Sequence, residues 1–240
     1  MSKSVLRIAK INLMNVKTAY FVAALLVLNI VVQFFVQYLM AVNGADMSHS
    51  SNVSGGMMLW IVPLLAATII PARNFRRICN LGGRRNNFFW GTLIAYGMLA
   101  LLVSLANVLV FYTIDRFLQN SGLFDQSLFG GVFNLLEIFG WTANGVIIAF
   151  LRQAAFLFLV ASFVHTLVSI QDKWYGWVTD VVLIAIISVF TPIAPLRAVL
   201  VWFFNIILFH PNALLHILYC VGLGLVIYTL NKPIYARKAI

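Results

Sequence analysis

The order of apolar and polar residues divides the 240-residue chain into six long apolar runs separated by short polar segments. A helix needs about 20 residues, mostly apolar, to cross the hydrocarbon core of a bilayer. The runs lack the strict alternation of transmembrane β-strands, so each is predicted to be a helix. We therefore expect six membrane-spanning helices, over residues 19–42, 56–70, 88–112, 152–170, 176–191 and 213–230.

The composition agrees with this pattern. Hydrophobic residues make up 62% of the chain and charged residues 9%, and the mean hydropathy is +0.98. A soluble domain of this length needs far more polar surface, whereas a helix in lipid satisfies its backbone polar groups internally. The sequence predicts an all-α polytopic membrane protein with one transmembrane domain over residues 1–240, surrounded by the lipid bilayer.

The net charge of +10 lies mainly at the ends of the apolar runs. This placement is typical of topology signals, so we expect no nucleic-acid partner. If both termini are cytosolic, 13 of the 16 basic residues fall on the cytosolic side, which predicts that orientation in the plasma (cytoplasmic) membrane. The three basic residues left outside are Arg116, Arg152 and Arg197.

Three segments depart from simple spans and loops. Residues 1–18 place their basic residues on one helical face, which predicts an interfacial helix before the first span. Residues 116–151 are broken by glycines yet too apolar for open water, so we expect an outer interfacial region. In residues 191–212, Pro192 and Pro195 break the fifth helix and Arg197 caps the break. The apolar stretch that follows is too short to cross a bilayer, which predicts a re-entrant segment.

The loop over residues 71–87 concentrates five arginines and no acid. Read as a helix, it places its apolar and basic residues on opposite faces, and Gly82–Gly83 ends it. Asn86 or Asn87 is expected to cap the next helix, beginning at Phe88. The sequence predicts a short amphipathic helix along the inner membrane surface. Its arginines either bind anionic lipid headgroups or dock a cytosolic protein.

Chemical motifs are largely missing. The sequence has no P-loop, no H-E-x-x-H and no G-x-S-x-G, and its four histidines lack metal-ligand spacing. We expect no enzyme activity, metal or cofactor in this chain. Asp180, one turn into the fifth span, has either a structural or a functional role.

Polar residues inside the spans remain as candidate sites. Asn29, Gln33 and Gln37 form one stripe at i, i+4 and i+8 of the first span. These amides either join helices by hydrogen bonds or line a translocation path. Weaker candidates of the same kind are Asn107, His165 and Ser169.

The stretch "CNLGGRRNNFFWGTLIAY" resembles the segment that opens the third span in small bacterial permease subunits of type-2 ABC exporters, and "NKPIYARK" resembles their short basic tails. The resemblance implies that the basic loop is a coupling helix in a cleft of a separate ATPase subunit. It also implies two such ATPases, which bind ATP and Mg, and a second permease subunit, identical or not. Gly83 stands where many relatives carry a small polar residue or alanine. The docking residues implied are Arg73, Phe75, Arg76, Arg77, Ile78, Leu81, Gly82, Gly83, Arg84 and Arg85.

The function implied is export. A path with few charges suits an amphipathic or hydrophobic cargo such as a peptide, a lipid or a drug. Two other classes remain. An ion-coupled secondary transporter normally shows an ion site and an inverted repeat, and neither is visible. A membrane anchor would recruit a cytosolic partner through the same arginines without changing its ATP hydrolysis.

Overall fold

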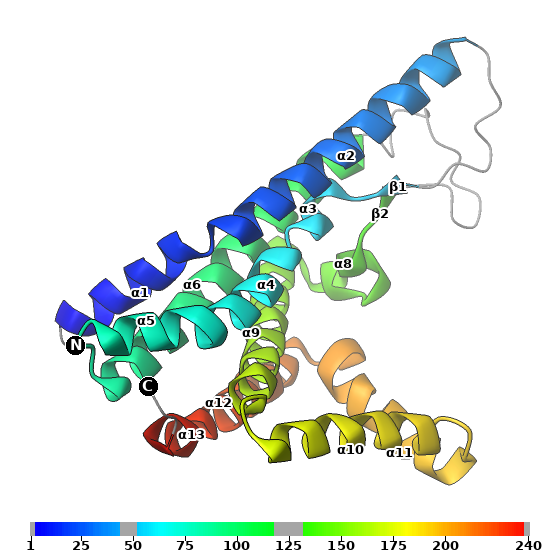
Figure 1. Ribbon diagram of the computed structural model, residues 1–240. Helices are drawn as coiled ribbons and strands as arrows, with labels where there is room; N and C mark the ends of the chain where they lie inside the picture. The colour runs from blue at the N-terminus through cyan, green and yellow to red at the C-terminus, as the bar shows by residue number, and fades with distance from the viewer. Residues whose placement is uncertain (1–2, 44–51, 118–131, 238–240) are drawn as a thin grey trace.

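A computed structural model describes residues 3–43, 52–117 and 132–237. It is almost entirely helical, with one short pair of parallel strands (Figure 1). Five helical runs are long and apolar enough to cross a membrane, and a bent pair makes a sixth if it counts as one span. The predicted all-α class is therefore confirmed, and these helices are compatible with a multi-pass membrane protein.

The elements keep the order of the predicted segments. The first half contains α1 (Lys3–Asn15), α2 (Lys17–Val42), β1 (Asn52–Val53), α3 (Gly55–Met58), α4 (Ile61–Ile69), the π-helix η1 (Ile70–Asn74), α5 (Phe75–Asn80), α6 (Arg85–Val110) and the π-helix η2 (Phe111–Asp115). The second half contains β2 (Val132–Phe133), α8 (Leu135–Ile138), the 3₁₀-helix η3 (Trp141–Asn144), α9 (Val146–Ile170), α10 (Trp174–Phe190), α11 (Ala194–Phe204), the π-helix η4 (Asn205–Phe209), α12 (Ala213–Thr229) and α13 (Asn231–Arg237).

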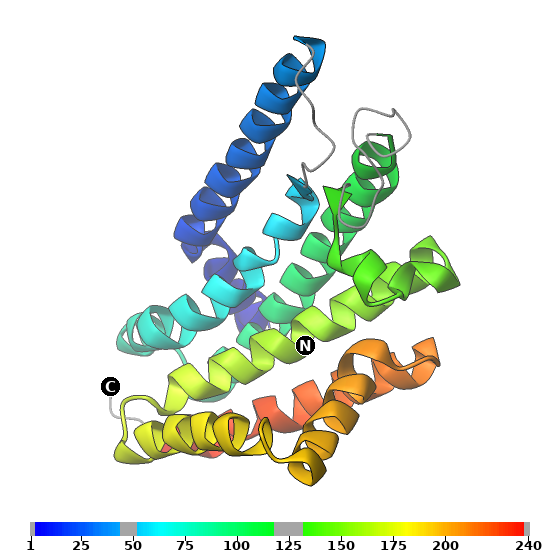
Figure 2. The same cartoon turned by 90° about the vertical axis from the view of Figure 1, so that its right-hand side faces the viewer.

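Helix α9 lies at the centre of the bundle and packs against α4, α6 and α12 (Figure 2). Its buried face contains small residues such as Ala154, Ala155 and Ala161. Small side chains let helix backbones approach closely, which is how helices associate in lipid. Helix α12 approaches α9 closely at Gly224, where an added Cβ would lie only 3.0 Å from the Phe158 ring.

Helix α1 packs lengthwise against α6. It buries Val5, Ile8 and Ala9, and a Cβ added at Gly91 of α6 would lie 2.8 Å from Ile8 Cγ2. The helix predicted within residues 1–18 therefore exists, but it is fastened to the bundle through this close approach. Its contact with the membrane surface remains a prediction.

The second span is longer than predicted. Helices α3, α4, η1 and α5 form one run over Gly55–Asn80, so α5 extends a span and is not a separate helix that begins after Ile70. The predicted span ended at Ile70, directly before Pro71. A proline removes only one N–H donor, and the wider π-helical turn of η1 accommodates it.

The break between α10 and α11 is confirmed, because the two helices are bent by 116°. Pro195 occupies the first turn of α11, where its missing N–H costs nothing. Arg197 closes that turn through its backbone N–H, which donates to Ile193 O at 2.8 Å. The re-entry of this pair into one leaflet stays a prediction.

The outer interfacial region predicted over residues 116–151 is described only in part, since residues 118–131 lie outside the described residues. Part of its described portion is buried within the protein. Leu136 and Trp141 are fully buried and pack with Val108 and Phe111 of the third span. Helix α9 also begins at Val146, six residues before the predicted start, so Arg152 is a buried residue within it.

Candidate docking surface and the polar contacts behind it

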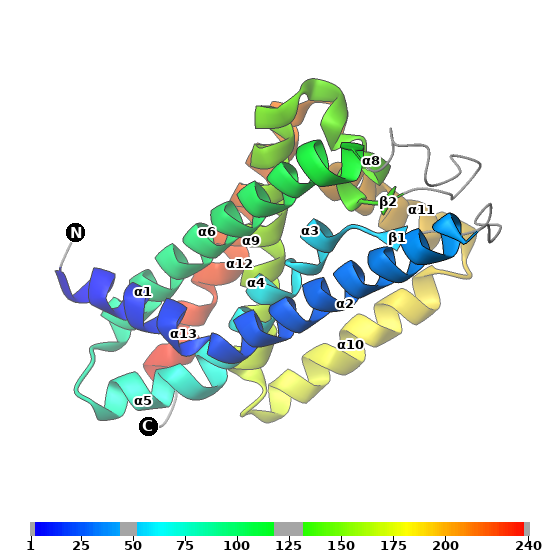
Figure 3. The ribbon, with the colours of Figure 1, turned by 90° about the horizontal axis from the view of Figure 1, so that it is seen from above.

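Exposed basic residues gather at one end of the bundle, where α1, α5, α13 and both ends of the described chain lie (Figures 1 and 3). We call this the basic end. Helix α5 and its flanks contribute Arg73, Arg76, Arg77 and Arg84, and all four side chains are exposed. The same end also presents Lys3, Arg7, Lys10, Lys17, Lys173 and Lys232.

Aromatic packing fixes α5 to the C-terminal helix. The Phe75 ring stacks on Tyr235 of α13 with centroids 4.7 Å apart, and Phe88 of α6 meets both rings edge-on. All three rings are buried, at 2% exposure or less. Buried aromatic pairs contribute beyond their area, so α5 is held in a defined position.

The two glycines after α5 end the helix as predicted. Gly82 has φ +81°, its N–H donates to Cys79 O, and the Gly83 N–H donates to Ile78 O at 2.9 Å. These two bonds form a Schellman motif, which favours glycine at the left-handed position. A Cβ at Gly83 would lie 2.7 Å from Ile78 O, so this position also needs glycine.

The predicted docking residues divide into exposed and internal ones. Phe75 and Ile78 are buried, so they support α5 from behind and present no surface to a partner. Leu81 is 80% exposed at the end of the helix. Arg76 lies 3.8 Å from Asp172, and both side chains are largely exposed, which makes this a weak ion pair.

Arg85 has a role inside the chain. Its guanidinium donates to Tyr235 O at 2.9 Å and to Ala236 O at 2.6 Å, and so satisfies carbonyls in the last turn of α13. Helix α6 also begins at Arg85, three residues earlier than predicted, with Arg84 at its N-cap. Asn87 does not cap it, because its amide donates to Ser4 Oγ of α1.

A buried polar chain continues from Tyr235 into the bundle. The Tyr235 hydroxyl lies 2.5 Å from His165 Nε2, and the Tyr96 hydroxyl lies 2.6 Å from His165 Nδ1. Ser169 Oγ is 3.2 Å from the Tyr235 hydroxyl. A neutral imidazole has one donor and one acceptor, so one tyrosine donates and the other accepts. These hydrogen-bonded side chains join α13, α9 and α6.

A second polar chain holds α1 beside the docking surface. The Asn12 amide of α1 donates to Thr92 Oγ1 of α6 at 2.9 Å, and the Asn74 amide of η1 donates to Asn12 Oδ1 at 3.1 Å. All three side chains are buried. Helix α1 is therefore joined to both spans that flank α5.

Two members of the polar stripe of the first span, Asn29 and Gln33, lie on an exposed face of α2. Gln33 Nε2 donates to Asn29 Oδ1 at 2.9 Å, and both residues are exposed. Gln37 belongs to the same helix, but its side chain lies outside the described residues. Within the described part of the chain, this hydrogen bond stays inside α2 and does not fasten it to a neighbouring helix.

Asn107 lies in a different setting from the stripe. It is fully buried, and the Asn134 amide donates both to its Oδ1 and to Asp115 Oδ2, at 3.2 Å each. A Cβ added at Gly56 of α3 would lie 2.5 Å from Asn107 Oδ1. Asn107 therefore joins the C-terminal end of α6 to its neighbours, and its side chain is enclosed by the described residues.

The end of the bent helix pair is held by three side chains that sequence patterns did not single out. Trp141 Nε1 donates to Leu208 O at 2.8 Å, Arg152 Nη2 donates to His210 O at 2.6 Å, and His216 Nε2 lies 2.6 Å from Ile207 O. The last carbonyls of a helix have no partner within it. These contacts join the end of η4 to η3, α9 and α12, whereas Pro192, Pro195 and Arg197 are exposed at the opposite end of α11.

Within the described ranges, no group of three or more histidine, cysteine, aspartate or glutamate residues is placed to hold a metal ion. Comparison with known proteins adds no family: no family model, no curated protein and no solved structure matches the chain. The resemblance to ABC permeases therefore remains an expectation based on the quoted residues.

Proposed function

We propose that this chain is the membrane-spanning permease subunit of an ABC exporter, with α5 receiving a separate cytosolic ATPase that binds ATP and Mg. The observation that carries the proposal is the way α5 is held. It continues α4 without a break, its Phe75 ring stacks on Tyr235, and Tyr235 contacts His165 of the central helix α9. A displacement of α5 would therefore move several spans together.

The support for α5 favours docking over a purely electrostatic role. Charges that only set topology or attract lipid headgroups need no fixed position. Here the arginines stand on a helix that is held by a buried aromatic cluster and ended by two glycines that the backbone requires. A defined shape of this kind is what a complementary protein surface recognises.

The cargo proposed is an amphipathic or hydrophobic molecule, and two copies of the chain, or this chain with a related permease, would enclose its path. Two features support a second subunit. None of the eleven residues of α11, all of them described, is buried. The Asn29–Gln33 pair on α2 is also exposed, although amides within a span favour a polar partner.

The test is co-purification of the full-length chain from its native membrane in mild detergent. Wild type is compared with Arg76→Glu/Arg77→Glu and with the matched control Arg116→Glu/Arg197→Glu, which makes the same charge change away from α5. We expect a stoichiometric ATP-hydrolysing protein with wild type and the control, and its loss with the α5 variant. A partner that does not hydrolyse ATP would favour the anchor, and no partner with wild type would contradict docking.

A further inference from the structure

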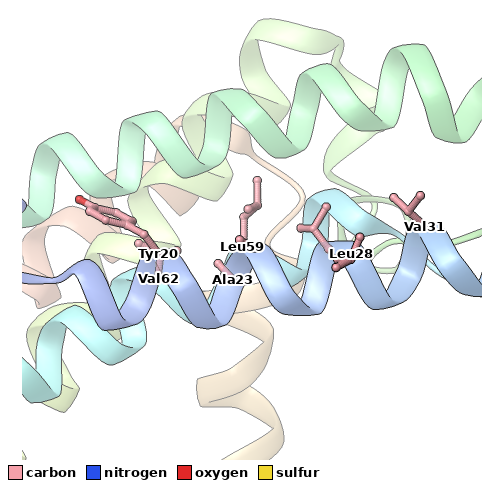
Figure 4. Close-up of a pocket in the computed structure, with 8 residues that line it drawn as sticks. Tyr20, Ala23, Leu28, Val31, Leu59 and Val62 are labelled. Atoms are coloured by element: carbon pink, nitrogen blue, oxygen red, sulfur yellow. The ribbon is translucent and has the colours of Figure 1, made fainter.

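An open, mostly apolar groove of about 500 Å³ runs between α2 and the beginning of α4 (Figure 4). Ala23 is buried in it, whereas Tyr20, Leu28 and Val31 of α2 are each at least 40% exposed. Leu59 and Val62 line the opposite wall. Two consecutive alanines, Ala23 and Ala24, leave space that larger side chains would fill. The chain therefore leaves a shaped apolar space on its outer surface.

The length of this groove matches one leaflet of a bilayer. Tyr20 and Val31 are eleven residues apart on α2, and at about 1.5 Å per residue the groove extends for about 16 Å. That is close to half of the ~30 Å hydrocarbon core. A single acyl chain that begins at the membrane interface covers the same depth.

Both walls carry a cation at the basic end. Lys17 precedes Tyr20 by three residues and so shares its helix face, and it is exposed. On the other wall, the run that contains Val62 continues without a break to exposed Arg73. Asn74, the residue after Arg73, donates to Asn12 Oδ1 of α1, five residues before Lys17. The cations therefore lie on neighbouring segments, η1 and the start of α2.

We propose that this groove binds one acyl chain of an anionic bilayer lipid, whose phosphate lies between Lys17 and Arg73. An apolar slot of leaflet depth with two cations at the interface end complements an anionic lipid in both shape and charge. A second copy fits less well, because a two-fold axis along the membrane normal would bring the same cations together. The proposal does not depend on ATPase docking.

The test uses the full-length chain reconstituted in vesicles of equal phosphatidylglycerol and phosphatidylcholine, extracted in mild detergent, and weighed with its retained lipid by native mass spectrometry. We expect one retained lipid per chain and about a twenty-five-fold preference for phosphatidylglycerol, since each of the two basic groups contributes a factor of about five. Lys17→Gln/Arg73→Gln should abolish the preference and still retain a lipid.

Three further variants make the result decisive. Ala24→Phe fills the groove and should lose both lipids, whereas Ala24→Leu fills it less and should lose them in part. The smaller substitution is the control for a folding defect caused by the larger one. Lys173→Gln removes a cation at the same end but away from the groove and should behave as wild type. Retention of lipid by both Ala24 variants, an unchanged preference in the double variant, or a protein dimer that Ala24→Phe dissociates would each overturn the proposal.

Discussion

Two regions that carry similar residues are built in opposite ways. At the basic end, Phe75 and Tyr235 are fully enclosed by contacts within the chain. In the α10–α11 pair, Trp177 is 68% exposed, and among the described residues of α10 only Gly176 is buried. The basic end is therefore a preformed surface, whereas the bent pair depends on lipid or another subunit to cover it. The difference separates a surface whose shape is fixed by contacts within the chain from one that such contacts leave uncovered.

The largest effect is expected at Tyr235. Tyr235→Ala removes a buried ring from the stack with Phe75 and should lower the free energy of unfolding by about 3–5 kcal/mol. Tyr235→Phe keeps the ring and leaves a His165 nitrogen without its hydroxyl partner, for a loss of about 1–3 kcal/mol. Unfolding of the full chain in mixed detergent micelles measures both. Equal losses would contradict the stacking.

A substitution at the contact between α1 and α6 should lower the free energy of unfolding nearly as much. Gly91→Ala places a methyl group against Ile8 and a backbone carbonyl of α1, and overpacking of this kind costs about 1–3 kcal/mol. We expect α1 to separate from α6, so trypsin should cleave faster after Lys10. Gly222→Ala, where the added carbon meets nothing within 4 Å, is the control. Unchanged cleavage in Gly91→Ala would show that α1 is not held at this point.

A smaller effect is expected at the end of α5. Gly82→Ala forces a side chain into the left-handed region and should cost about 1–2 kcal/mol. Gly97→Ala, within α6 and without close neighbours, should be neutral or stabilising by up to about 1 kcal/mol. The difference between the two variants, measured in the same micelles, isolates the turn. A similar response from both would remove the argument that α5 has a fixed end.

The smallest effect is expected in the bent pair. Trp177→Ala should change the unfolding free energy of the chain in detergent by less than about 0.5 kcal/mol, because exposed sites contribute little. The same substitution should weaken any assembly in the native membrane, which cross-linking of the full-length protein measures. A large loss of stability in detergent would show that α10 packs within the chain after all.

The sequence predicted what depends on local chemistry. Long apolar runs identified the spans, a glycine pair identified the end of α5, and two prolines identified the break before α11. It did not predict contacts between distant residues. Tyr96 looks like any aromatic residue of an apolar run, and Tyr235 lies in the short basic tail. Nothing near Arg85 in the sequence indicates that it binds carbonyls 150 residues away. The second span was predicted to end too early, at Ile70, and the π-helical turn of η1 accommodates Pro71 directly after it.

The most direct test of the docking surface uses two neighbouring positions. A photo-cross-linking amino acid is placed in intact cells at exposed Arg77, at buried Ile78 one residue later, and at exposed Arg197 far from α5. We predict cross-links from position 77 to an ATP-hydrolysing protein, and none to that protein from positions 78 and 197. Cross-links from position 77 to lipid alone, or equal capture from position 197, would contradict the proposal that α5 receives a partner.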